Sequence, residues 1–509
     1  MTNKIDSNIT GLAFAEEESL KTLPATPVWY GLEPNSYSDF GGELSTVARA
    51  PIDPSRQNKK GTITDLDASG GFNVDFTKSN LVRLLQGFFF ADARQLPSTQ
   101  ALNAAVVPLT SVTASSKTYA AASGLGSFAA SQIVFASGFT NAANNGLKTV
   151  ASSTAGTVVV NEALTDEASP PAAAKLETVG FQFASGDISL AVTSGIPSLV
   201  ATAADFTTLP GLIPGLWVFI GGDAAGTRFA NNVGYARIKS IAAKAIVFDD
   251  TSFTPATEAG TGKTIRLFVG TVIKNEKTPS LIKRRSYNIE RQLGQGPTAT
   301  QAEYLEGAVA NEFTLNVPQA DKLNADLTFV ACDNTHRSGE AGDEIKGGTR
   351  VGVAGEDAYN TSSDIYRIKM SVIDPASSNP SALFGYVSEA NVSINNNVSP
   401  NKAIGTLGAF DTSAGNFEVG GSITAYFTTI SAVRAVRQNA DVGLSIIGAS
   451  KNAGFVFDIP LLGLGGGRLN VEKDAPITVP LEPAGAENAN GYTMLYEAFS
   501  YLPNLAMPD

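Results

Sequence analysis

The run of residues that most resembles a reaction centre is Gly260-Thr261-Gly262-Lys263-Thr264. It is similar to the end of a phosphate-binding P-loop, in which backbone amides surround the phosphates and a lysine neutralises their charge. The full motif needs a glycine where Thr257 stands, and it needs a helix afterwards. Residues 265–269 instead read as a strand. We therefore expect an ordinary turn here and no nucleotide site.

A second candidate, residues 65–70, begins like a calcium-binding loop. Asp65 and Asp67 alternate before Gly70, as oxygen ligands do in such loops. The bidentate glutamate should stand at the twelfth position, which is Phe76. We expect a hairpin turn rather than a calcium site.

Few other residues could support chemistry. Cys332 is the only cysteine and His336 the only histidine. A disulfide within the chain is therefore excluded, an ordinary zinc site is not expected, and a conventional catalytic triad would have to use His336. We expect His336 in a polar surface loop, and a flexible bend with close backbone contacts at the glycine-rich run 463–467. The sequence predicts no catalytic residue, no cofactor and no metal, although a carboxylate dyad assembled from distant segments stays open.

The composition favours a mainly β protein that does not grip nucleic acid. Only 17% of the 509 residues are charged, against about 25% in average soluble proteins, and there are 49 glycines. Short strands joined by turns suit this mixture. The formal net charge is −12 and the isoelectric point is near 4.8, whereas nucleic-acid-binding proteins carry clustered lysine and arginine.

No segment looks like a membrane span or a targeting signal. The best candidate, residues 211–222, has 12 residues and contains Pro214, whereas a span needs about 20 apolar residues. The beginning of the chain is polar and acidic and has no apolar signal core. We expect a soluble protein that stays in the cytoplasm of the cell that makes it.

The first part of the chain, residues 1–98, has two runs typical of strands, 28–32 and 72–76. The polar stretch 41–71 lies between them and is expected to be a long loop. Leu81, Leu84, Leu85 and Phe88 follow at helical spacing and predict a short helix over 81–89.

The middle part, residues 99–265, is rich in alanine, serine, threonine and glycine, and it contains a repeat. Strand-like runs at 133–138 and 217–222 each lead to two asparagines and a glycine, namely Asn144-Asn145-Gly146 and Asn231-Asn232-Val233-Gly234. Further strands are expected at 157–160 and 245–248. Asparagine and glycine tolerate the positive φ of tight turns. The pattern predicts two small antiparallel β modules inserted into a host domain.

The last part, residues 266–509, returns to the style of the first. A strand at 422–427 and a short helix at 431–438 repeat the order strand, long polar loop, strand, helix. We interpret this as a duplication, with a first domain formed by 1–98 and 266–340 and a second formed by 355–509. The alternative is one composite domain in which the shared order arises by chance.

Several segments, taken in order, resemble tail tube (major tail) proteins of long-tailed bacteriophages, the siphophages. The resemblance spans roughly 11–98 and 270–505, about two thirds of the chain. It rests on residues 12–18, 22–30, 52–57, 71–76, 283–291, 307–332, 404–410 and 417–427. The order of these segments is more specific than any one of them.

The resemblance implies a mainly β fold of tandem tail-tube β-sandwich or barrel domains, each with a short helix, and a structural protein rather than an enzyme. Such subunits close into stacked rings whose inner strands form a β-barrel around a lumen, through which DNA passes without specific binding. The loop 41–71 would contact a neighbouring subunit or ring, through residues that include Asp53, Arg56, Gln57, Lys59 and Lys60. The middle modules would decorate the outside.

The partners implied are further copies of the chain and other tail proteins, namely the tape measure, tail terminator and distal tail proteins. The location implied is the virion tail, after synthesis in the cytoplasm of a bacterial host. Two domains per chain predict rings of three chains with pseudo-sixfold repetition, and one composite domain predicts rings of six. The rival hypotheses are a β-rich glycan-active enzyme, an adhesin and another virion structural protein.

Overall fold

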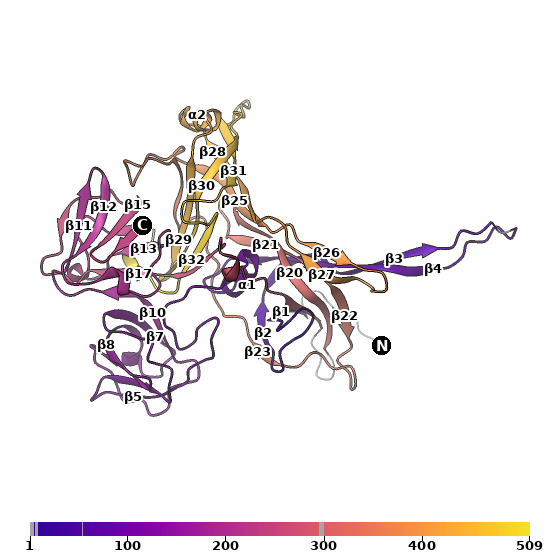
Figure 1. Ribbon diagram of the computed structural model, residues 1–509, viewed down its shortest axis with the longest axis horizontal. Helices are drawn as coiled ribbons and strands as arrows, with labels where there is room; N and C mark the ends of the chain where they lie inside the picture. The colour runs from indigo at the N-terminus through magenta and orange to yellow at the C-terminus, as the bar shows by residue number, and fades with distance from the viewer. Residues whose placement is uncertain (1–4, 6–8, 53, 295–299, 509) are drawn as a thin grey trace.

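The computed structural model describes residues 5, 9–52, 54–294 and 300–508. In these residues nearly all regular structure is β-strand, and the α-helices are two short ones (Figure 1). Strands from the first and last parts of the chain form a 17-stranded network, and strands from the middle form a 13-stranded sheet. The predicted mainly β class is confirmed.

The first group of elements lies on both sides of the middle part. Before it come β1 (Thr10–Glu16), β2 (Val28–Leu32), β3 (Pro34–Ala48), β4 (Gly61–Asp75) and α1 (Val82–Phe89). After it come β18 (Thr271–Lys274), β19 (Tyr287–Leu293), β20 (Gln301–Val317), β21 (Asn324–Ala331), β22 (Asp333–Arg337) and β23 (Thr349–Val351).

The second group is continuous in the sequence. It consists of β24 (Ile365–Val372), β25 (Val387–Asn395), β26 (Ser399–Lys402), β27 (Ala409–Ser413), β28 (Glu418–Tyr426), α2 (Ser431–Arg437), β29 (Val442–Ser450), β30 (Ala453–Gly466), β31 (Thr478–Gly485) and β32 (Leu495–Phe499). Short 3-10 turns lie at Ala142–Asn144, Phe206–Thr208, Ala225–Thr227, Pro279–Leu281 and Asn504–Ala506.

The two groups repeat one strand order. In the first unit, antiparallel pairing runs β1-β19-β20-β21-β4-β3. In the second unit, it runs β24-β29-β30-β31-β28-β25, again antiparallel throughout. β22 pairs with β20 as β32 pairs with β30, and the helix follows the equivalent strand, β4 or β28, in both units. This repeated order supports the duplication, while the predicted residue boundaries of the two domains stay a prediction.

A shared apolar core holds the two units together. Leu84, Leu85 and Phe88 of α1 are fully buried, which explains their helical spacing, and α1 begins one residue later than the sequence predicted. Phe76, at the end of β4, packs 5.0 Å from Phe455 of β30, measured between ring centroids. The first unit therefore buries its aromatic side chains against strands of the second.

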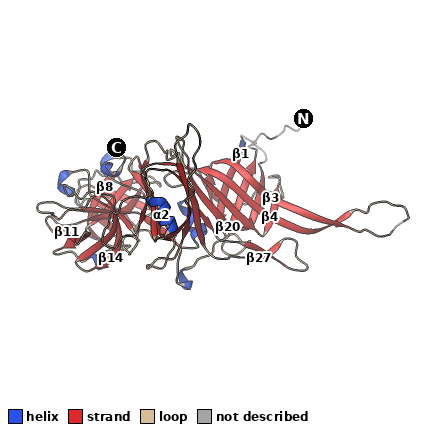
Figure 2. Cartoon of the chain, turned by 90° about the horizontal axis from the view of Figure 1, so that it is seen from above, coloured by secondary structure: helices blue, strands red, loops and turns tan. Residues whose placement is uncertain are grey.

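The prediction of a long loop at 41–71 is wrong. Most of this stretch belongs to β3 and β4, which pair from Pro34↔Val74 to Ala48↔Gly61. The distal part of this hairpin is exposed on both faces, so its residues need not alternate between apolar and polar. We call the projecting hairpin, residues 34–75, the arm. Figures 1 and 2 show it extending away from the body as a thin ribbon.

The middle part lies on the opposite side of the body from the arm (Figure 1). Its strands are β5 (Leu109–Thr113), β6 (Thr118–Ala121), β7 (Gln132–Ser137), β8 (Gly146–Ser153), β9 (Thr157–Val160), β10 (Lys175–Gln182), β11 (Ile188–Thr193), β12 (Ile196–Ala201), β13 (Trp217–Ile220), β14 (Gly234–Ala242), β15 (Ala245–Thr251), β16 (Glu258–Ala259) and β17 (Arg266–Val269). The four predicted module strands are confirmed. Each module repeats the predicted order of three antiparallel strands, β7-β8-β9 in the first and β13-β14-β15 in the second. The two modules are joined by pairing of β10 with β17.

The asparagine repeat has a different cause from the one we expected. Asn232 is fully buried, donates to the Ala256 carbonyl and the Glu258 carboxylate at 2.9 and 3.0 Å, and accepts from the Ala256 N–H at 2.9 Å. In the first module, Asn144 makes the same three bonds to Thr165 and Glu167. Asparagine is needed because it offers a donor and an acceptor to one buried backbone segment. Only the glycines that follow have positive φ.

Replacing this buried asparagine should destabilise its module. Asn232→Ala leaves the backbone groups of Ala256 and the Glu258 carboxylate short of partners, and we expect a loss of about 2–4 kcal/mol in the free energy of unfolding. Asn231 is exposed beside it, and Asn231→Ala should change stability by less than about 0.5 kcal/mol. Denaturant unfolding followed by tryptophan fluorescence measures both, and equal losses would contradict the assigned role.

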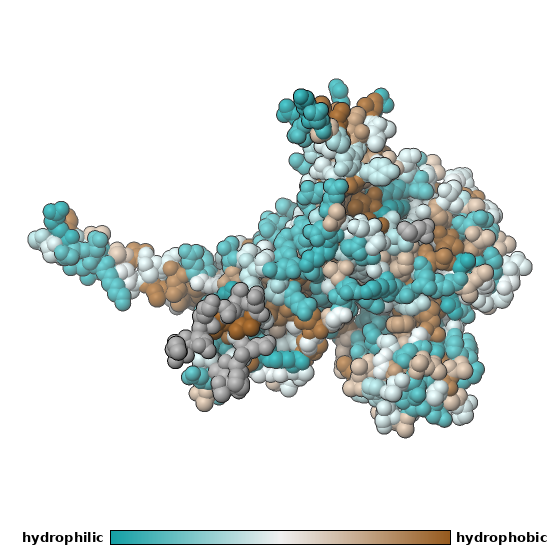
Figure 3. All heavy atoms as spheres, turned by 180° about the vertical axis from the view of Figure 1, so that it is seen from behind, coloured by the Kyte–Doolittle hydropathy of each residue, from teal (hydrophilic) through white to brown (hydrophobic). Residues whose placement is uncertain are grey.

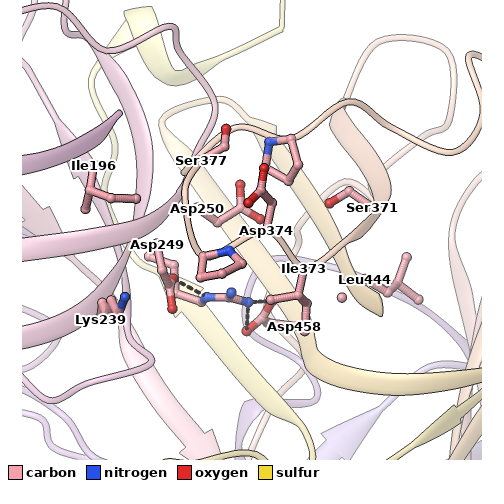
Figure 4. Close-up of a pocket in the computed structure, with 14 residues that line it drawn as sticks. Ile196, Lys239, Asp249, Asp250, Ser371, Ile373, Asp374, Ser377, Leu444 and Asp458 are labelled. Atoms are coloured by element: carbon pink, nitrogen blue, oxygen red, sulfur yellow. Dashed lines mark hydrogen bonds and ion pairs between the residues drawn. The ribbon is translucent and has the colours of Figure 1, made fainter. Parts of the chain in front are cut away.

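The second module is fixed to the second unit by a shared core and a buried ion pair. Trp217 and Phe268 cluster with Val456 of β30 and Phe499 of β32. Arg237 of β14 lies 3.1 Å from Asp458 of β30, whose side chain is fully buried, and 2.8 Å from Asp249 of β15. Figure 4 shows Asp249 and Asp458 reaching this contact from the module and from the unit. Burial raises the pKa of Asp458 to about 6, against the opposing effect of the Arg237 guanidinium.

Removing the cation should cost more than an ordinary surface substitution. Arg237→Ala leaves Asp458 buried without a counter-charge, and we expect a loss of about 3–5 kcal/mol in the free energy of unfolding. Lys239 is exposed two residues along the same strand, so Lys239→Ala should change stability by less than about 0.5 kcal/mol. The double variant Arg237→Met/Asp458→Leu should recover most of the loss, and failure to recover would contradict the unpaired charge of Asp458 as its cause.

Candidate self-assembly surface

The arm is built as a contact element rather than as part of a core. Leu44, Val47, Ile52 and Ile63 are exposed large apolar side chains on it. A two-stranded ribbon is marginally stable alone in water. Exposed apolar side chains on such a ribbon indicate that it packs against a partner.

The tip of the arm carries the residues that the sequence singled out. Arg56, Gln57, Lys59 and Lys60 all lie in the segment between β3 and β4, and all are exposed. Arg56 has φ of +57°. Asp53 lies outside the described residues. The structure thus places the four described residues together at one exposed tip, while their role in assembly stays a prediction.

The base of the arm is rigidly held. The Arg291 guanidinium lies 4.7 Å from the ring centroid of Phe40 on β3 and contacts the Glu303 carboxylate of β20. Asn73 on β4 donates to Asp326 of β21 at 2.7 Å. Pairing of β4 with β21 adds a continuous ladder from Asp75↔Asn324 to Ala68↔Ala331. The arm therefore projects from a fixed base.

A hairpin of the second unit lies against this base. Lys402 at the end of β26 contacts Asp65 at 2.6 Å and also binds Asp67, both on β4. The hydrogen bond from Lys402 lowers the pKa of Asp65, and the same pair of aspartates raises the pKa of Lys402. Nothing in the sequence around Lys402 marked it as a partner of residues more than 300 positions away.

The aspartates are thus explained without calcium, and the hairpin turn predicted for residues 65–70 is wrong. These residues lie inside β4, where Asp65 and Asp67 are two positions apart and share one face of the strand. The turn predicted at 260–264 is confirmed, because the run joins β16 to β17. Lys263 there lies 3.3 Å from Glu258.

His336 and the glycine-rich run also differ in detail from expectation. His336 lies in β22 rather than in a loop, exposed and 3.4 Å from Glu303. Residues 463–466 form the end of β30, and the bend falls at Gly466 and Gly467, with φ of +74° and +77°. Burial raises the pKa of the Cys332 thiol to about 11.

The described residues lack two features that other functions would require. They contain no group of three or more histidine, cysteine, aspartate or glutamate side chains arranged to hold a metal ion. Within the same residues, no helix is both long and apolar enough to cross a membrane.

One comparison with known proteins identifies a family. A family model described as phage tail tube protein matches residues 7–209 and 178–484, so the two matched segments span nearly the whole chain. No curated protein matches the chain.

Proposed function

This chain belongs to the phage tail tube protein family, and we propose that it is the structural subunit that closes into stacked rings to form the tail tube of a siphophage virion. The observation that carries the proposal is the repeat of one antiparallel strand order in two units, in which β3 and β24 each have one strand partner among the described residues. Closing such edges against other copies prevents uncontrolled strand pairing. The proposed role is structural, without catalysis.

Ring symmetry follows from the number of units, because each unit would occupy one position around the lumen. Two units per chain favour rings of three chains with pseudo-sixfold repetition, and six chains per ring is the alternative. The two units would correspond to the domains 1–98 with 266–340 and 355–509. The inner strands would form a β-barrel around the lumen, and an acidic protein of net charge −12 would let DNA pass without binding it.

In the assembled tail, the middle modules would lie outside the tube wall, since they and the arm lie on opposite sides of the body (Figure 1). The second module shares its core with the second unit, so it would also brace the wall. The tube would end on other tail proteins, namely the terminator and distal tail proteins, and would enclose the tape measure protein. Synthesis would take place in the cytoplasm of the bacterial host.

The arm provides the test of this function. Replacing residues 46–63 by an Asn-Gly turn keeps Asp65, Leu66 and the base of the arm, and it removes the exposed ribbon with Arg56 and Lys60. We expect a folded protein with the parent's circular dichroism spectrum that no longer forms tubes. Electron microscopy of the purified parent and variant measures the result.

A matched variant separates the ribbon from its charged tip. Replacing Arg56, Gln57, Lys59 and Lys60 by alanine keeps the full ribbon and should shorten or destabilise the tubes without abolishing them. Tubes of normal length from the deletion variant would refute the role of the arm. A parent protein that forms neither rings nor tubes would refute the proposed function itself.

A further inference from the structure

We infer that neighbouring copies of the chain join by adding β3 of one copy to the open edge of β30 in the next copy, as β25 is added to β20 inside each chain. The inference rests on the proposed tube function and names the surface through which a ring would close. The partner is a second copy of this chain.

The internal junction supplies the template. β25 of the second unit pairs with the second half of β20 in the first unit, from Glu312↔Asn395 to Val317↔Ala390. The Asn395 side chain donates to the Glu312 carboxylate across this pairing at 3.0 Å. One unit of this fold can therefore receive the edge strand of another through backbone pairing.

The helix of the first unit is part of the same junction. Asn396, almost fully buried, donates to the carbonyls of Phe88 at 2.9 Å and Ala310 at 3.1 Å. The ring of Phe417 lies 5.9 Å from that of Phe89 at the end of α1. The second unit thus covers the C-terminal end of the helix in the first.

The equivalent position on the second unit is unfilled. β20 pairs with β19, β21, β22 and β25, whereas β30 pairs with only β29, β31 and β32 in the part of the chain that the structure describes. Pairing with β29 ends at Leu462, and pairing with β31 uses the other edge from Leu462 to Gly466. The edge of β30 beyond Leu462 is therefore open.

β3 is the corresponding open donor. It occupies the place of β25 in the repeated strand order, and β4 is its one strand partner among the described residues. The match extends to single residues, because Ser38 pairs with Gly71 of β4 as Val392 of β25 pairs with Gly421 of β28. β3 therefore offers a donor edge and β30 a matching acceptor edge, which is the condition for a ring of identical contacts.

We call the proposed contact between β3 of one copy and β30 of the next copy the seam. Exposed apolar side chains lie beside its acceptor strand, β30. Ile430, Leu469, Val471 and Ile477 are exposed apolar residues around α2 and the β30–β31 hairpin. Figure 3 shows apolar side chains on this upper projection. Around α1, the corresponding region is covered by the second unit. The apolar residues around α2 are thus exposed, whereas the equivalent region around α1 is covered by the second unit.

The glycine-rich run fits the same role. A Cβ added at Gly463 would meet nothing closer than Asn439, 4.0 Å away, so space remains beside the strand. Glycine in a strand often marks a place where another backbone approaches closely. The proposed contact accounts for Gly463, which has no close neighbour within one chain.

Disulfide trapping tests the seam. Ser36 is an exposed residue of β3, and Leu469 is an exposed residue three positions beyond the end of β30, so the two residues lie on opposite sides of the proposed contact. Ser36→Cys/Leu469→Cys should form chains linked between copies when assembled tubes are oxidised at pH 8, seen on a non-reducing gel. The buried Cys332, with its pKa of about 11, should not compete. Ser36→Cys/Leu505→Cys is the control, because Leu505 is exposed beside the middle part, where the neighbouring Asn504 N–H donates to Asp223.

A second pair of variants covers failure of the cysteine protein to assemble. Leu469 and Leu505 are exposed to similar extents, 39% and 44%. Leu469→Glu should lower the yield of tubes at least tenfold, and Leu505→Glu should leave it unchanged, with both variants folded by circular dichroism.

The outcomes separate the seam from the function. If the parent forms tubes but oxidised tubes of Ser36→Cys/Leu469→Cys contain no cross-linked chains, or if Leu469→Glu forms normal tubes, the proposed contact is overturned and the tube function stands. Absence of tubes from the parent would overturn both.

Discussion

An open strand edge has backbone N–H and C=O groups without partners, and the architecture of this protein depends on how such edges are closed. Inside the chain, one edge is closed by adding β25 to β20, and this pairing turns two units into one body. The shared aromatic core around Phe76 and Phe455 then fixes the angle between the units. The same need, unmet at β3 and β30, makes self-association the natural completion of the fold.

The remaining features serve this arrangement in different ways. The base of the arm is held by Arg291 and by pairing with β21, so the exposed ribbon starts from a rigid platform. The second module is bound through Arg237 and Asp458, which lie in a mostly buried contact where a lone charge would be costly. The first module keeps its own core and repeats the asparagine-centred bonding of the second. The two modules therefore share a folding pattern, but only the second shares its core with the second unit.

Local periodicity explains what could be predicted from the sequence. The helix around Leu84 and Phe88 buries one face, so its apolar residues recur at helical spacing, whereas the module strands β7 and β13 are short apolar runs that are mostly buried. The sequence of the arm resembles a loop because Leu44 and Val47 lie on a ribbon that is exposed on both faces. The asparagine repeat is evident in the sequence, but its cause is not. The side chain of Asn232 bonds to Ala256, which lies more than 20 residues away.

The candidate self-assembly surface can be predicted from the sequence only in part. The family resemblance indicates the charged tip, whereas no local pattern links Lys402 to Asp65, because the two residues lie more than 300 positions apart. Sequence order alone did suggest a duplication, since each short helix follows the same kind of strand.

The measurement that tests the central claim most directly is the mass of isolated rings, obtained by native mass spectrometry of protein released from tubes. Two units per chain predict a ring of three chains, three times the 52.8 kDa of one chain. A ring of six chains would contradict the account, because each chain would then occupy a single position around the lumen despite its repeated strand order.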